Sequence, residues 1–109
     1  MNQLYRIEDY RAQSHRVFFD RNELNQLLSL YSRQVAAGRW RDYAIDQTET
    51  TARFSVFRHT HDLPLFSIEK ARARKGWEFR VMSGGSKVST TANLSKALLN
   101  FRKTLRVVS

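Results

Sequence analysis

The chain has 109 residues, of which 41% are hydrophobic and 27% are charged, and these values are typical of one folded domain. It contains no cysteine, which excludes disulfides, thiolate metal sites and thiol nucleophiles. The net charge is +9, and no apolar run is long enough for a signal-peptide core or a membrane span, so we expect a cytoplasmic protein without a membrane partner.

The first strong signal in the chain is a helix that begins after Asp20. Residues 1–16 are polar and aperiodic, which predicts a mobile arm before a single domain over residues 17–109. Asp20 is a good N-cap, and Glu23 stands at the capping-box spacing. Gly38 is expected to provide a left-handed C-cap. The spacing of five apolar residues predicts the buried stripe of this helix: Leu24, Leu27, Leu28, Tyr31 and Val35.

Several short motifs with fixed spacing lie in and after this helix. They include Val17-Phe18-Phe19-Asp20-Arg21, Val35-Ala36-Ala37-Gly38, Trp40-Arg41-Asp42-Tyr43, Phe54-Ser55-Val56-Phe57-Arg58 and Ile68-Glu69-Lys70. Together they resemble a family of short alphaproteobacterial proteins of unknown function, over roughly residues 17–70. The resemblance implies a bacterial cytoplasmic protein of one domain. It supplies no catalytic or binding residues.

After Gly38 the hydrophobic period changes from helical to alternating, which predicts strands. The expected strands cover residues 40–46, 51–58, 64–70 and 77–83, with a short edge strand over residues 87–91. A six-residue basic loop, Ala71 to Gly76, is expected between the third and fourth strands. The inward residues of the second, third and fourth strands are expected to be Ala52, Phe54, Val56, Phe66, Ile68, Trp77, Phe79 and Val81.

A second helix of about twelve to fourteen residues is expected after Asn93, which is a favourable N-cap. Its predicted stripe consists of Leu94, Leu98, Phe101 and Leu105, with Ala97 beside it. The predicted fold is therefore α+β: an N-terminal helix, a four- to five-stranded antiparallel β-meander and a C-terminal helix, with both helices on one face of the sheet. This order resembles the topology of the Whirly and PUR single-strand-binding folds and, less closely, that of the double-stranded-RNA-binding domain.

Catalytic and metal-binding signals are weak. His59 and His61 precede Asp62, but alternate residues of an extended segment point to opposite sides, so ordinary loop chemistry is the preferred interpretation. Asp42 and Asp46 share one strand face and are interpreted as solvated edge residues rather than as an acid–base pair. No nucleophile or phosphate-loop motif is present. We therefore expect neither enzyme activity nor a cofactor or metal.

The excess positive charge lies entirely in the last part of the chain. Residues 1–69 contain nine Lys or Arg and nine Asp or Glu, whereas residues 70–109 contain ten Lys or Arg and one acid, Glu78. This asymmetry favours nucleic acid, either DNA or RNA, as the partner, although a merely solubilising surface would give the same count. The expected contact residues are Arg53, Phe57, Arg72, Arg74, Lys75, Arg80 and Lys87.

The alternative hypothesis comes from the apolar residues expected on the outward sheet face. Tyr43, Phe57 and Met82 would there form a surface that docks another protein or a second copy of the chain as a homodimer. In that case the protein is an interaction or regulatory module, and its positive charge is incidental.

Overall fold

The computed structural model describes residues 16–59 and 63–99, so that all of the arm expected over residues 1–16 except Arg16 lies outside the described residues. Helix α2 spans Arg21–Ala36. Five strands follow it: β1 (Asp42–Gln47), β2 (Thr51–Phe57), β3 (Phe66–Ala73), β4 (Gly76–Ser83) and β5 (Ser86–Thr91). Residues 94–99 are helical, and the rest of the expected second helix, including Phe101 and Leu105, lies outside the described residues.

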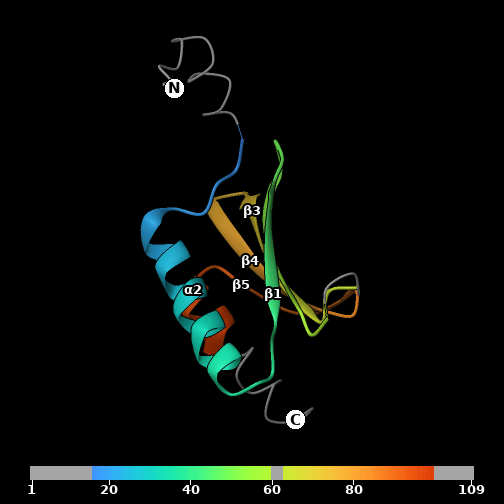
Figure 1. Cartoon of the computed structure of the whole chain (residues 1–109). Coiled ribbons are helices and arrows are strands. Elements are labelled where there is room, and N and C mark those ends of the chain that lie inside the picture. The colour runs from blue at the N-terminus through green and yellow to red at the C-terminus, as the bar shows by residue number, and fades with distance from the viewer. Residues whose placement is uncertain (1–15, 60–62, 100–109) are drawn as a thin grey trace, which may run out of the picture.

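The five strands form one antiparallel sheet in the order β1-β2-β3-β4-β5, which is the meander that the alternating pattern predicts. Both α2 and the helical residues 94–99 lie on the same face of the sheet (Figure 1). We call this the helix face and the opposite one the open face. The predicted α+β class and its two-layer arrangement are confirmed. None of the helices in the described part of the chain is long and apolar enough to cross a membrane.

Both ends of α2 are built by the residues that the sequence indicates. The carboxylate of Asp20 accepts a hydrogen bond from the Glu23 N–H at 2.8 Å, and the Glu23 carboxylate accepts one from the Asp20 N–H at 2.8 Å. This reciprocal pair is a capping box. At the other end Gly38 has φ 76°, and the N–H groups of Gly38 and Arg39 donate to the carbonyls of Val35 and Gln34. That pattern is a Schellman motif, which requires the left-handed conformation that glycine adopts at little cost.

The hydrophobic core lies between α2 and the sheet. The residues of α2 that it buries differ in part from the predicted stripe. Leu27 and Leu30 are the buried residues of α2, whereas Val35 is 40% exposed. Leu24, Leu28 and Tyr31 pack at the margin of the core. The buried face is centred on Leu27 and Leu30, and Val35 lies about 80° around the helix from Leu27. The predicted stripe omitted Leu30 and wrongly included Val35. Apolar residues at several different spacings are compatible with more than one orientation of the helix toward the core.

The inward residues of β2, β3 and β4 agree with the alternation, but Tyr43 does not lie where it was expected. Tyr43 pairs with Val56, whose side chain is buried on the helix face. Its ring stacks on Phe54 at 5.5 Å and meets the Tyr31 ring edge-on at 4.7 Å. The expectation that Tyr43 belongs to the open face is therefore wrong.

Asn93 begins the helical residues near the C-terminus, as expected. Its side-chain Oδ1 accepts a hydrogen bond from the Lys96 N–H at 3.2 Å. Leu94, Ala97 and Leu98 are buried in the same core as α2, as the predicted stripe requires. The short helical segment is also joined to α2 at the surface, where the Ser95 hydroxyl donates to the Gln26 side chain at 3.3 Å.

Candidate nucleic-acid interface

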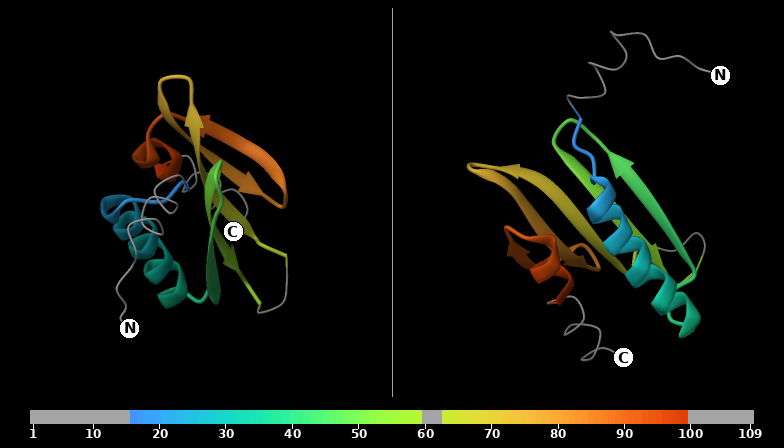
Figure 2. Two further views of the ribbon diagram at one scale, coloured as in Figure 1. Left: turned by 90° about the horizontal axis from the view of Figure 1, so that it is seen from above. Right: turned by 90° about the vertical axis from the view of Figure 1, so that its left-hand side faces the viewer.

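The hairpin between β3 and β4 extends beyond the strands on either side of it. The β2–β3 pairing ends at Thr51 and Ala71, and the β4–β5 pairing ends at Phe79 and Thr91. The β3–β4 pairing continues to Ala73 and Gly76. Residues 72–77 therefore form a projecting two-stranded ribbon, which both views of Figure 2 show as the yellow hairpin that passes its neighbours. We call these residues the ribbon.

This arrangement corrects the expected six-residue basic loop. Only Arg74 and Lys75 form the turn, and Gly76 begins β4 with φ 109°. Arg72 belongs to β3 and pairs with Trp77. Taken alone, the alternating Ala and Arg residues resemble a polar loop. In the fold, β3 extends to Ala73 because β4 pairs with it as far as Gly76. Arg72 is consequently held on paired backbone, and Arg74 and Lys75 are held in a two-residue turn.

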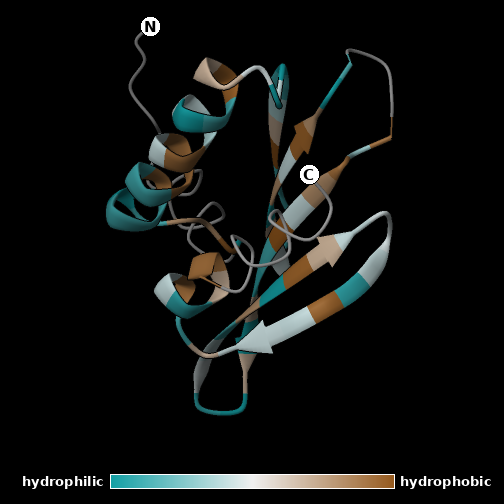
Figure 3. Cartoon of the chain, turned by 90° about the horizontal axis from the view of Figure 1, so that it is seen from below, coloured by the Kyte–Doolittle hydropathy of each residue, from teal (hydrophilic) through white to brown (hydrophobic). Residues whose placement is uncertain are grey.

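The ribbon carries three cations and no acid: Arg72, Arg74 and Lys75. All three are exposed, and none makes an ion pair within the part of the chain that the structure describes. The turn is hydrophilic at its tip (Figure 3). The nearest acid along β4 is Glu78, whose carboxylate accepts a hydrogen bond from Arg80 Nε at 2.6 Å. The ribbon therefore presents concentrated positive charge without an ion pair, although Lys75 lines a pocket that also contains Asp20 and Glu23.

The side chain of Trp77 supports the base of the ribbon. The guanidinium carbon of Arg72 lies 5.0 Å from the centre of the Trp77 ring, within the range of a cation–π contact. Lys70 Nζ lies 4.4 Å from the same centre. Trp77 itself is half-buried against the core. Its packing thus limits the freedom of Arg72.

The two arginines expected on the open face are present there, but both are neutralised. Arg53 Nε donates to the Glu69 carboxylate at 2.7 Å, and Arg80 Nη1 reaches the other oxygen of that carboxylate at 3.4 Å. Arg80 also pairs with Glu78. The hydrogen bond with Glu78 is the main cause that raises the pKa of Arg80 above its ordinary value. Two cations and two carboxylates thus form an internally neutral network.

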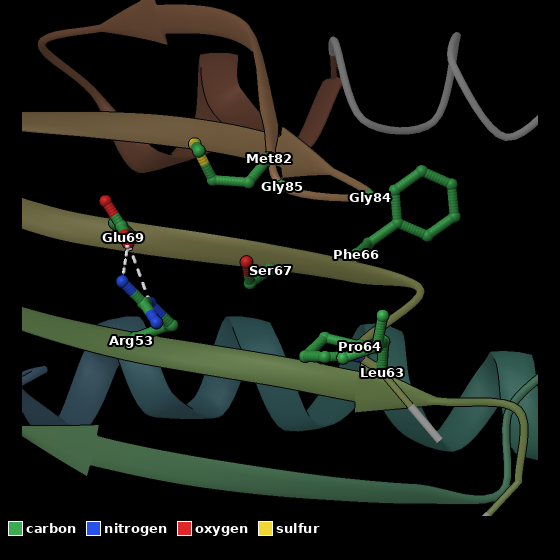
Figure 4. Close-up of a pocket in the computed structure, with 9 residues that line it drawn as sticks. All are labelled: Arg53, Leu63, Pro64, Phe66, Ser67, Glu69, Met82, Gly84 and Gly85. Carbon is green, nitrogen blue, oxygen red and sulfur yellow. Dashed lines mark hydrogen bonds and ion pairs between the residues drawn. The ribbon is translucent and has the colours of Figure 1, made fainter.

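A cleft of about 310 Å³ lies beside this network on the open face (Figure 4). In the figure, Arg53 and Glu69 face each other at one end of it, and α2 lies behind the sheet. Leu63, which is 88% exposed, stands beside Pro64 at the cleft edge. The full lining is Arg53, Leu63, Pro64, Phe66, Ser67, Glu69, Met82, Gly84 and Gly85. The cleft therefore combines an apolar part with one ion pair.

Phe57 and Lys87 lie far from the ribbon. Phe57 ends β2 and pairs with Asp42, at the end of the sheet opposite the β1–β2 turn. Lys87 follows the Gly84–Gly85 turn and pairs with Met82. Both turn glycines have positive φ, as a tight two-residue hairpin requires. The structure thus brings Arg72, Arg74 and Lys75 together but leaves the other four expected contact residues elsewhere.

Sequence reasoning missed Lys70. Its side chain is only 5% exposed, and its Nζ donates to Glu23 Oε1 at 2.7 Å and to the Phe18 carbonyl at 2.8 Å. The strand alternation already contained the signal, because Lys70 follows Phe66 and Ile68 at the same spacing. Its partner lies 47 residues away and could not be identified from local pattern.

No group of three or more His, Asp or Glu side chains suited to a metal ion occurs in the described ranges. His61 and Asp62 lie outside those ranges. Asp42 and Asp46 are both exposed on β1, which is an edge strand of the sheet.

Comparison with known proteins gives a family without a known activity. A model described as a protein of unknown function, DUF2794, matches residues 17–98. No curated protein and no solved structure matches the chain. The matched segment begins before the capping box of α2, includes all five strands and ends within the helical residues 94–99. The chain therefore belongs to the family of proteins of unknown function DUF2794.

Proposed function

We propose that this protein is a non-enzymatic, cytoplasmic nucleic-acid-binding protein whose ribbon contacts phosphates. The observation that carries the proposal is the set of three unpaired cations on a projecting hairpin without an acid. In water the mutual repulsion of such cations costs less than about 1 kcal/mol per pair, so the fold tolerates them easily. Their value lies in binding, because each phosphate contact releases condensed counterions.

The location of the charge also favours this function over general solubility. Arg53, Lys70 and Arg80 are all satisfied by carboxylates of this chain. A surface that served only solubility would gain equally from cations spread over the molecule. Here, three cations that form no ion pair with a carboxylate of the described residues are concentrated on the six residues of the ribbon, which projects beyond the neighbouring strands.

A binding assay with two charge-matched variants tests the proposal. Arg72→Gln/Arg74→Gln/Lys75→Gln removes the ribbon cations, and Arg39→Gln/Arg41→Gln/Arg58→Gln removes three exposed cations at the opposite end of the sheet. Fluorescence anisotropy with labelled oligonucleotides at about 100 mM salt should show affinity reduced on the order of 100-fold by the first variant. The second should change affinity much less. Absence of measurable binding by the wild type at about 50 mM salt would overturn the proposal.

A second candidate function is a protein-interaction module, and the cleft on the open face favours it. The Arg53–Glu69–Arg80–Glu78 network is neutral, and the exposed Leu63 lies at the cleft edge. This is the composition of a protein interface, with an apolar centre beside satisfied polar groups. The occupant proposed for it is a second copy of the chain, which would give a homodimer.

Sedimentation equilibrium over a range of protein concentrations tests this second candidate. A homodimer that uses the cleft should lose its concentration-dependent mass when Leu63→Asp and Met82→Glu are introduced together. Val88→Asp provides a control, because Val88 is an exposed apolar residue of the edge strand β5 outside the cleft. A wild type that remains monomeric at every concentration would rule out the homodimer.

A further inference from the structure

The ribbon also indicates which kind of nucleic acid it fits. We infer that its partner is double-stranded DNA in the B form and that the ribbon enters the major groove. This inference rests on the nucleic-acid function proposed above and adds the class of partner and the mode of contact.

The dimensions of the ribbon match that groove. Paired strands lie about 4.8 Å apart, and the B-DNA major groove is about 12 Å wide and 8.5 Å deep, which admits a two-stranded ribbon. Beyond the Ala71–Glu78 pair, each strand advances two residues before the turn. At about 3.3 Å per residue plus the turn, the projection is about 7–10 Å. The tip can therefore reach the groove floor while the end of the sheet remains outside.

The distribution of charge agrees with this depth. Arg74 and Lys75 form the tip, from which their long side chains can extend to the phosphates on either side of the groove, and Arg72 lies nearer the sheet, at the level of the phosphates on the groove rim. Arg16 is exposed at the same end of the sheet. Its Nη1 donates to the Gln47 carbonyl at 3.3 Å, next to the β1–β2 turn. Arg16 is therefore placed to contact a phosphate on the groove rim.

Single-stranded nucleic acid fits the described surface less well. Its recognition requires aromatic rings free to stack on bases together with unpaired cations along the backbone path. The open face instead presents Arg53 and Arg80 in ion pairs. On the other face, the Trp77 ring already has two cations within 5.0 Å of its centre, so that a stacked base would compete with Arg72. The open sheet face predicted as a stacking surface is thus poorly equipped for that role.

Double-stranded RNA is disfavoured by groove shape. The major groove of an A-form helix is deep and narrow, and its minor groove is wide and shallow. A ribbon of two strands with long basic side chains is too wide to enter the narrow major groove of the RNA. The shallow minor groove of the RNA would not enclose the ribbon between phosphates. Duplex DNA is the form that surrounds the ribbon with phosphates on both sides.

The test compares three labelled probes of one sequence, each about two helical turns long: duplex DNA, single-stranded DNA and double-stranded RNA. Two further arms locate the groove. One uses a duplex whose cytosines carry a glucosylated hydroxymethyl group at C5, which fills the major groove. The other adds netropsin, which occupies the minor groove. Circular dichroism confirms that the protein is folded before binding is measured.

The expected result is that duplex DNA binds at least about tenfold more tightly than the other two probes. Filling the major groove should weaken binding by about tenfold or more, whereas netropsin should leave it unchanged. Equal or tighter binding of the single strand or of RNA, or indifference to the filled groove, would overturn the duplex inference and leave the proposed function standing. Absence of binding to all three probes would overturn both.

Discussion

Lys70 Nζ lies 2.7 Å from Glu23 Oε1, and the same carboxylate oxygen accepts a hydrogen bond from the backbone N–H of Asp20. This contact connects strand β3, which contains Lys70, to the first turn of α2. The Phe18 carbonyl and the Trp77 ring complete the surroundings of the ammonium. One buried cation thus joins the segment before α2, the capping box and the base of the ribbon.

The first prediction concerns this contact. Lys70→Met should lower the free energy of unfolding by about 3–5 kcal/mol, because it leaves the Glu23 carboxylate, whose side chain is only 14% exposed, without its cation. Urea denaturation measures the change. Lys87→Met, at an exposed lysine of β5, should alter stability by less than about 0.5 kcal/mol. A loss below about 1 kcal/mol for Lys70→Met would show that the pair contributes little.

The second prediction concerns the helix cap. Asp20→Ala removes the acceptor of the Glu23 N–H, and we expect a loss of about 0.5–2 kcal/mol in the free energy of unfolding. Asn25→Ala is the matched control, because Asn25 is exposed within α2 and alanine is the better helix former. A denaturation midpoint that Asp20→Ala leaves unaltered would contradict the capping role.

The third prediction separates two adjacent leucines of α2. Leu27 is fully buried, so Leu27→Ala should cost about 2–5 kcal/mol through lost contacts and a residual cavity. Leu28 lies at the core margin and its replacement by alanine should cost distinctly less. Thermal denaturation of the two variants gives the comparison. If Leu28→Ala were the more destabilising, the orientation assigned to α2 would be wrong.

The fourth prediction concerns stability at high pH. Burial, followed by the charge of Asp42, raises the pKa of Tyr31 above its ordinary value. Stability that depends on the neutral phenol is therefore complete below about pH 10 and is lost as pH rises through the higher native pKa. The Tyr31 hydroxyl also donates to the Arg41 carbonyl at 3.0 Å.

The stability difference between wild type and Tyr31→Phe should consequently shrink over the interval that begins at about pH 10 and extends through the higher native pKa. Chemical denaturation at several pH values measures it. A difference that stays constant over this interval would indicate that Tyr31 titrates alike in the folded and unfolded chains.

Local signals predicted the elements well. Asp20, Glu23 and Gly38 define the ends of α2 through contacts within four or five residues, and such contacts are legible in sequence. The alternation of buried residues in β2 and β4 is equally local. Each of these features follows from backbone geometry and does not depend on which distant segment lies alongside.

Apart from the stripe of α2, where Leu30 and Val35 were assigned incorrectly from a local pattern, the errors concern pairing between segments. Tyr43 was assigned to the wrong face because its orientation follows from its pairing with Val56, and sequence pattern does not give register. The length of the ribbon likewise depends on how far β3 and β4 pair after their neighbours stop. For the candidate site, the three ribbon cations were identified, but the neutralisation of Arg53 and Arg80 by Glu69 was not.

The salt dependence of binding tests the central claim most directly. The slope of log K against log salt should be measured with duplex DNA for the wild type and for the two charge-matched triple variants. We predict that Arg72→Gln/Arg74→Gln/Lys75→Gln flattens the slope by about 2–3 units and that Arg39→Gln/Arg41→Gln/Arg58→Gln leaves it unchanged. Equal flattening by both variants, or none by the first, would contradict the assignment of phosphate contacts to the ribbon.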